Sequence, residues 1–232
     1  MKYFIGFFTW LFIASGWPIV TQQLGAAQVN RPRPADIRID HDVLAENQRL
    51  EYIFLDVLQG TGLHGGFVEV AVCSDLPKGH LQIKQGLTVR QAMDALVAAN
   101  PGYRWELRNG VVDLMPRGGV PLLSTRIAKY KMNVTDREIA AVLHGTLKLA
   151  EVRERSAAIG LKPGVNHGPG GEAVESHPVP RKHASVQINL QNVSLQEAFN
   201  KIVQASPDAV WIYHENDCNG AKTFTVQMAS HH

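Results

Sequence analysis

The sequence is poor in cysteine and in unbalanced charge. It has 2 cysteines among 232 residues, too few for a disulfide-rich miniprotein or a four-cysteine zinc site. Its 23 Lys and Arg residues face 21 Asp and Glu residues, and no run of like charge forms a tail. We therefore expect no nucleic-acid partner. With 45% apolar and 19% charged residues, the chain has enough apolar material for a packed core.

The sequence also lacks the motifs that mark common active sites. It contains no H-E-x-x-H, H-x-H or G-x-S-x-G pattern. The segment Gly60–Gly65 matches G-x-G-x-x-G, but we expect a helix before it and a strand after it, the reverse of a dinucleotide site. We therefore expect no catalytic, cofactor-binding or metal-binding residues, and a protein that is not an enzyme.

The N-terminus has the pattern of an export signal. Lys2 precedes an apolar run from Tyr3 to Ala14, and small residues allow cleavage after Gly16 or after Ala27. The run is short for a membrane span of about 20 residues. We assign residues 1–27 to a signal peptide and expect a periplasmic or secreted protein, which would touch the membrane only through an uncleaved signal.

Export would place both cysteines in a compartment where disulfides persist. Cys73 lies in the first half of the chain and Cys218 in the second, so a disulfide would join the halves. Two separate thiols are the alternative, because the sequence does not give the distance between the Cα atoms.

An internal repeat follows the lead-in segment 28–34. Two amphipathic helices share a capping box, a proline stop and a tryptophan in the next strand. The matched pairs, 106 residues apart, are Thr88 and Ser194, Gln91 and Glu197, Pro101 and Pro207, and Trp105 and Trp211.

The flanking patterns extend the repeat to two modules, residues 35–117 and 122–229. Each is expected to run strand, helix, strand, strand, helix, strand, strand, which gives an α+β fold of two βαββαββ modules with helices packed on short sheets. The second module has a strand over 123–131, a third capping box over 135–138, and a loop rich in Gly, Pro and His over 158–183.

These patterns resemble the secretin and TonB short N-terminal domain, a small periplasmic module. The second half resembles a divergent copy of it. The pieces in the first half that carry the resemblance are Phe54–Leu63, Phe67–Val72, Leu87–Ala99, Tyr103–Leu107 and Val111–Leu114. The resemblance implies a role in contacts between proteins, at outer-membrane secretion channels or TonB-dependent receptors.

We therefore expect a periplasmic accessory or adaptor of such a system, with a protein as its partner. Binding is expected at an exposed sheet edge, formed by Leu123–Lys131 or by Thr223–Met228. The alternative is a small periplasmic hydrolase or ligand-binding protein that uses the 158–183 loop, with a deep pocket near the loop base.

Four aromatic side chains offer a second candidate surface. Tyr103 and Trp105 are two residues apart, as are Trp211 and Tyr213, so each pair points to one face of its strand. They could form the core, or they could form a face that binds a partner or a glycan.

Overall fold

A computed structural model describes residues 34–73, 78–135, 139–164 and 185–230. The protein has an α+β fold, as predicted. The predicted signal peptide, most of the lead-in and most of the 158–183 loop lie outside the described residues.

The first half follows the predicted order of elements. After a short 3₁₀ turn over Pro34–Asp36 come β1 (Val43–Arg49), α1 (Leu50–Leu58), β2 (His64–Val72), β3 (Lys78–Ile83), α2 (Val89–Ala99), β4 (Tyr103–Arg108) and β5 (Val111–Pro116). Of the glycines of the G-x-G-x-x-G match, Gly60 and Gly62 lie between helix α1 and strand β2, and Gly65 lies within β2. Gly60 and Gly62 have φ angles of 71° and 66°, the left-handed region that glycine adopts without strain.

The second half repeats this order with one addition. Its elements are β6 (Arg126–Thr135), α3 (Ile139–Thr146), α4 (Ala150–Ala158), β7 (Leu161–Pro163), β8 (Ser185–Ser194), α5 (Leu195–Val203), β9 (Ala209–Cys218) and β10 (Ala221–Ser230). The strand predicted from Leu123 begins three residues later, because Leu123 lies in a turn. The sequence analysis did not predict α4, whose apolar stripe is weak.

Capping boxes begin both helices of the repeat. In α2 the Gln91 N–H donates to the Thr88 hydroxyl at 3.2 Å, and the Gln91 side chain accepts from the Thr88 N–H. In α5, Ser194 and Glu197 make the same reciprocal bonds. Each box satisfies backbone donors that the first helical turn leaves unpaired, which is why these helices begin where the sequence predicts. The third box falls largely outside the described residues.

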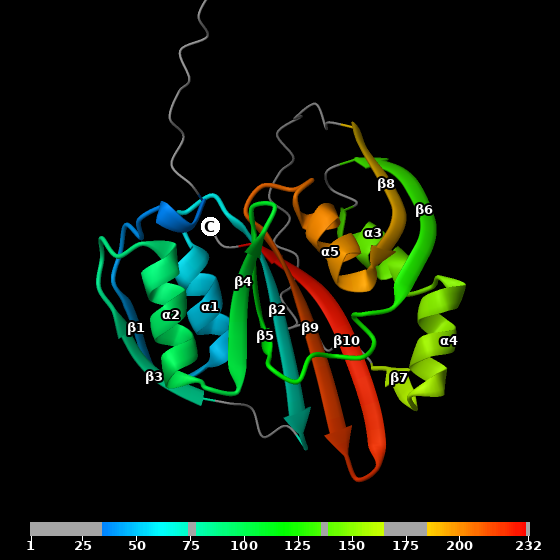
Figure 1. The fold of residues 1–232 in the computed structure, drawn as a ribbon, viewed down its shortest axis with the longest axis horizontal. Helices are drawn as coiled ribbons and strands as arrows, with labels where there is room; N and C mark the ends of the chain where they lie inside the picture. The colour runs from blue at the N-terminus through cyan, green and yellow to red at the C-terminus, as the bar shows by residue number, and fades with distance from the viewer. Residues whose placement is uncertain (1–33, 74–77, 136–138, 165–184, 231–232) are drawn as a thin grey trace, which may run out of the picture. The chain divides into compact units, whose positions relative to one another are not determined.

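The halves meet in one six-stranded sheet of order β4-β5-β2-β9-β10-β7 (Figure 1). The first half supplies β4-β5-β2 and the second supplies β9-β10-β7, so equivalent strands follow the same order. Within each set the first pair is antiparallel and the second pair is parallel. Parallel pairing of β2 with β9, over Gly65–Val72 and Val210–Asp217, joins the two sets. The predicted boundary over 117–122 therefore does not separate two sheets.

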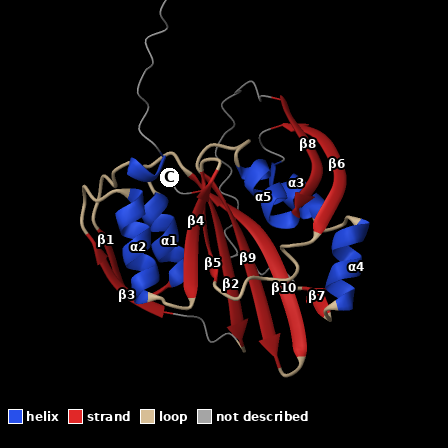
Figure 2. Ribbon diagram, viewed as in Figure 1, coloured by secondary structure: helices blue, strands red, loops and turns tan. Residues whose placement is uncertain are grey.

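The helices cover both faces of this sheet (Figure 2). One core contains α1, α2 and the sheet residues Phe67, Val112, Leu114, Val210 and Ile212. The other contains α3, α5 and residues such as Val68, Val111, Trp211 and Tyr213. The two-stranded sheets β1-β3 and β6-β8 pack against the helices of their own halves. Each half thus places its helices between a two-stranded sheet and its share of the central sheet.

Candidate functional site

The four aromatic residues do not form an exposed interaction face. Trp211 and Tyr213 are fully buried in one core, and Tyr103 is buried in the other. Trp105 is half-buried, donates from Nε1 to Asp94 Oδ1 at 2.8 Å, and lies under the guanidinium of Arg90. The candidate face is therefore corrected to core packing for Tyr103, Trp211 and Tyr213, which the helices of their own halves cover, whereas Trp105 keeps part of its surface exposed.

Cys73 and Cys218 form a disulfide at the junction of the halves. Cys73 follows the last residue of β2, and Cys218 is the last residue of β9, so their strands are neighbours and their Cα atoms lie 4.4 Å apart. The Cys73 N–H also donates to the carbonyl of Asp217 at 3.3 Å. The disulfide thus fastens one end of the only strand pair that joins the two halves within the described central sheet.

A buried set of charges lies further along the same strand pair. We call Arg49, Glu51, Glu69 and His214 the junction cluster. Glu69 on β2 is fully buried, and His214 on β9 approaches it with Nδ1 at 2.9 Å and approaches Glu51 with Nε2 at 3.3 Å. Arg49 approaches Glu51 at 2.9 Å and Glu69 at 3.3 Å. The cluster binds a strand of the second half to elements of the first.

The cluster balances its own charge when His214 is protonated. Burial by itself would lower the pKa of His214, but hydrogen bonds and negative charge from Glu51 and Glu69 raise it to about 9. The ligating atoms of Glu51, Glu69 and His214 lie within 4.8 Å of one another, close enough to bind a metal ion. Both ring nitrogens already face carboxylates, however, and Arg49 supplies a second cation. We therefore interpret the cluster as an ion-pair network.

A second buried carboxylate, Asp113 on β5, lies on the other face of the sheet. It accepts hydrogen bonds from Asn200 Nδ2 at 2.7 Å and from Gln196 Nε2 at 2.9 Å, both on α5. Its Oδ1 atom is buried and has no hydrogen-bond partner among the described residues. Burial raises the pKa of Asp113 to about 7, although both amide donors lower it. Gly66 of β2 leaves the space that this side chain fills, since a Cβ there would overlap Asp113.

Replacing Asp113 by asparagine should remove a pH dependence of stability. The pKa of Asp113 is raised above its ordinary 3.8, so folding favours the protonated form and stability falls as pH rises from about 4 to about 7. Each pKa unit corresponds to roughly 1.4 kcal/mol. Urea unfolding at pH 4.5 and pH 8 should show a smaller pH difference for Asp113→Asn than for wild type. Glu154→Gln, at an exposed carboxylate, should keep the full difference.

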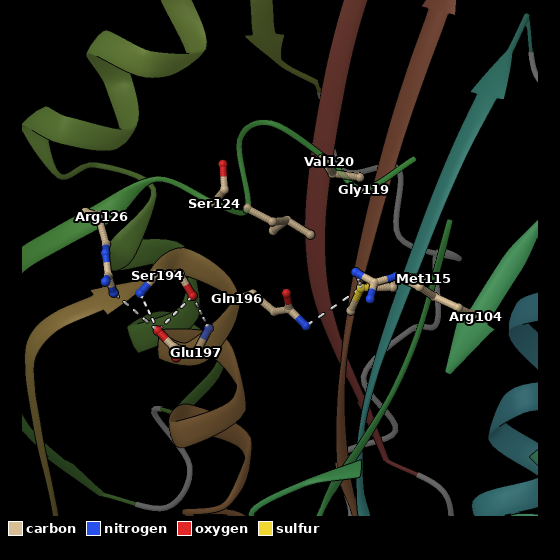
Figure 3. Close-up of a pocket in the computed structure, with 10 residues that line it drawn as sticks. Arg104, Met115, Gly119, Val120, Ser124, Arg126, Ser194, Gln196 and Glu197 are labelled. Carbon is tan, nitrogen blue, oxygen red and sulfur yellow. Dashed lines mark hydrogen bonds and ion pairs between the residues drawn. The ribbon is translucent and has the colours of Figure 1, made fainter. Parts of the chain in front are cut away.

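A cavity of about 340 Å³ is lined in part by Gln196, one of the two donors to Asp113 (Figure 3). It separates Arg104 and Met115, on β4 and β5, from the N-terminal end of α5. Arg104 donates to the Met115 sulfur at 3.3 Å, and across the cavity Arg126 lies 3.8 Å from Glu197. The Ser194 hydroxyl is held by Glu197 in the capping box, so it is not set up as a nucleophile. The lining instead provides two cationic side chains, Arg104 and Arg126, that a ligand could contact.

A second cavity lies at the other end of β4 on the same face of the sheet. It measures about 260 Å³, and its lining includes Arg108, Lys201 and Glu197. Arg104 and Arg108 are four residues apart and point to the same side of their strand. The face of β4 toward α5 therefore carries two hollows with basic side chains, separated by the carboxylate of Glu106.

The outer edge of β4 is open in the described residues, where β5 is the only strand that pairs with it. Arg108 and Val111 close a two-residue hairpin whose turn residues both have positive φ. In such a hairpin the two closing residues exchange both of their backbone hydrogen bonds. From there along the strand, the backbone N–H and C=O groups of successive residues point alternately away from the paired strand and toward it. The backbone groups that point outward from the sheet therefore belong to Tyr103, Trp105 and Leu107.

Neither of the two sheet edges predicted from the sequence is the outer edge of β4. The predicted edge over Thr223–Met228 lies within β10, which pairs with β9 along its length. Among the described residues, β7 covers the other side of β10 at Lys222–Phe224. The prediction was therefore wrong at Thr223 and Phe224, and it stays a prediction over 225–228. The predicted edge over Leu123–Lys131 corresponds to β6, which pairs with β8 in a two-stranded sheet. Its exposed Lys129 and Lys131 are of one sign, a feature that disfavours pairing with a further strand.

The alternative site at the 158–183 loop falls mainly outside the described residues. At the described base of the loop, Pro163 and Gly164 line a cavity of about 400 Å³ together with His144, Lys148 and Phe224–Val226. The described part of this lining has no carboxylate and no Ser or Cys nucleophile. A hydrolase or ligand-binding protein at this loop stays a prediction.

The sequence matches no protein-family model, no curated protein and no solved structure. The resemblance to the secretin and TonB short N-terminal domain therefore stays a prediction. Among the described residues, no helix is long and apolar enough to span a membrane.

Sequence reasoning missed the junction cluster and the Asp113 network. Each joins residues far apart in the chain, such as Glu69 with His214 and Asp113 with Asn200. One local signal was available. Glu69 and Asp113 are single carboxylates within apolar strand segments, and a buried carboxylate requires a partner.

Proposed function

We propose that this protein is an exported, non-enzymatic interaction module that binds a protein partner by accepting a strand at the outer edge of β4. We further propose that it acts in the periplasm as an accessory or adaptor of an outer-membrane secretion or TonB-linked system. The observation that carries the binding mode is the internal junction, where β9 accepts β2 along the edge that is equivalent to the open edge of β4.

The equivalence extends to the backbone groups. Trp105 of β4 corresponds to Trp211 of β9 in the repeat. In both hairpins the backbone groups of successive residues point alternately toward and away from the hairpin partner. Trp211 and Tyr213 therefore point theirs toward β2, and Trp105 and Leu107 point theirs away from β5. At the β4 edge, Trp105 and Leu107 thus present donors and acceptors equivalent to those that Trp211 and Tyr213 direct toward β2.

The surroundings of β4 supply selectivity. In strand addition, the main chain gives affinity, and pockets for alternate side chains give specificity. The cavities beside Arg104 and Arg108 lie on one face of β4, so they could receive two side chains four residues apart on the same face of an added strand. The disulfide supports the proposed export, because such bonds persist in oxidising compartments.

A photo-crosslinking amino acid at the exposed position 104 tests this function. The protein would be exported to the periplasm and irradiated, and its adducts would be compared in two further backgrounds. Leu107→Pro removes an outward N–H without removing a bond to β5, whereas Leu107→Ala loses side-chain packing but keeps the N–H. We expect adducts to persist in Leu107→Ala and to fall at least tenfold in Leu107→Pro. Equal adducts in both variants would exclude strand addition at β4.

A further inference from the structure

We propose that the strand accepted at the β4 edge is β4 of a second copy of this chain, paired antiparallel with Trp105 opposite Trp105 on the two-fold axis. This inference rests on the proposed function, because it names the partner of the same edge. It makes the assembly a closed two-fold dimer in which two six-stranded sheets become continuous.

The hydrogen-bonding directions allow this pairing. Antiparallel partners exchange both bonds when the backbone groups of both residues point at each other. The backbone N–H and C=O groups of Trp105 point away from β5, so the Trp105 residues of two copies can form such a pair. Leu107 would donate its N–H to the Tyr103 carbonyl of the other copy. The Tyr103 N–H is already used by the Asn100 carbonyl at 2.9 Å, so this donor is satisfied before any association.

The charges on β4 favour this register over the two registers that are shifted by two residues. With Trp105 at the centre, Arg104 of each copy lies opposite Glu106 of the other. A shift of two residues one way places Glu106 opposite Glu106 and Arg104 opposite Arg108. The shift the other way places Arg104 opposite Arg104. Like charges directly opposite each other destabilise strand pairs, and opposite charges stabilise them, so the Trp105-centred register is favoured over both shifts.

The side chains on the other face of β4 are also compatible with this pairing. On that side Trp105 would meet its own copy, and Tyr103 would meet Leu107. Aromatic and apolar cross-strand pairs of this kind stabilise sheets. Trp105 and Leu107 are only half-buried in the single chain, so both have surface left to cover.

The opposite end of the sheet, as far as the structure describes it, is formed by a shorter strand than β4. That end is β7, which has three residues and includes Pro163, whose nitrogen cannot donate to a ladder. The edge of β4, with six residues and no proline, is the longer one. Association of two copies through the central sheet therefore uses β4 against β4.

Charge-exchange variants test the register. Arg104→Glu places two pairs of glutamates in contact in the proposed dimer, and Glu106→Arg places two pairs of arginines in contact. Each variant alone should dimerise at least tenfold more weakly than wild type in sedimentation velocity at low salt. An equimolar mixture of the two should recover association to within about threefold of wild type, because every cross-strand pair in the mixed dimer is again of opposite sign.

The mixture also shows that the variants are folded. A wild-type chain that stays monomeric to millimolar concentration would overturn the inference, as would a dimer that neither variant weakens or that mixing does not restore. If the wild type is monomeric while adducts with another protein still depend on the Leu107 N–H, the second copy is excluded but strand addition at β4 stands. If neither dimer nor adducts form, both proposals fail.

Discussion

His214→Ala is expected to lower the free energy of unfolding by about 3–5 kcal/mol, the usual effect of removing one partner from a buried ion pair. The variant leaves Glu69, which is fully buried, with Arg49 at 3.3 Å as its remaining cation. Urea unfolding at pH 6.5 would measure the loss. His144→Ala, at an exposed histidine, is the matched control and should change stability by less than about 0.5 kcal/mol.

The pH dependence separates charge from packing. The pKa of His214 is raised above its ordinary 6.5 to about 9, so its stabilisation is fully present below about pH 6.5 and is lost as pH rises through about 9. The difference between His144→Ala and His214→Ala should therefore shrink from pH 6.5 to pH 10. Glu69→Gln in the His214→Ala background should recover part of the loss. A difference that does not change with pH would mean that His214 acts only through packing.

Removing the disulfide with Cys73→Ser and Cys218→Ser together should lower the free energy of unfolding by about 2–5 kcal/mol. The bond closes a loop across a sequence separation of 145, so it strongly restricts the unfolded chain. Thermal and urea unfolding of the double variant would measure the effect.

Reduced wild-type protein is the control for the serine side chains. It should unfold at the same urea concentration as the double variant, and oxidised wild type should unfold at a higher one. If oxidised and reduced wild type unfold together, the disulfide does not contribute to the stability of the junction.

Local sequence signals predicted the local structure well. Helices α2 and α5 begin at the predicted capping residues Thr88 and Ser194, because a capping box satisfies its donors within four residues of chain. The hairpin at Asn109 and Gly110 is likewise fixed by residues that adopt positive φ. The α+β class followed from counting such elements.

The joining of the halves could not be predicted in the same way. Pairing of β2 with β9 brings Glu69 to His214 across most of the chain, and no local pattern encodes that distance. The alternation of Trp211 and Tyr213 showed that they share a face of the strand, but not that α5 covers it. The predicted edge over Thr223–Met228 was wrong at Thr223 and Phe224 for the same reason, because a strand lies at an edge only if no other strand pairs with it on that side.

The identical strand order of the two halves has a consequence for their origin. A half on its own would expose β2 at one edge of its sheet and β4 at the other, and these are the two kinds of edge that meet where β2 pairs with β9. Two separate copies of an ancestral half could therefore have met as the halves do now. Gene duplication and fusion would then have turned a contact between molecules into a contact within one, leaving the ancestral edge of β4 at one end of the described central sheet and that of β7 at the other.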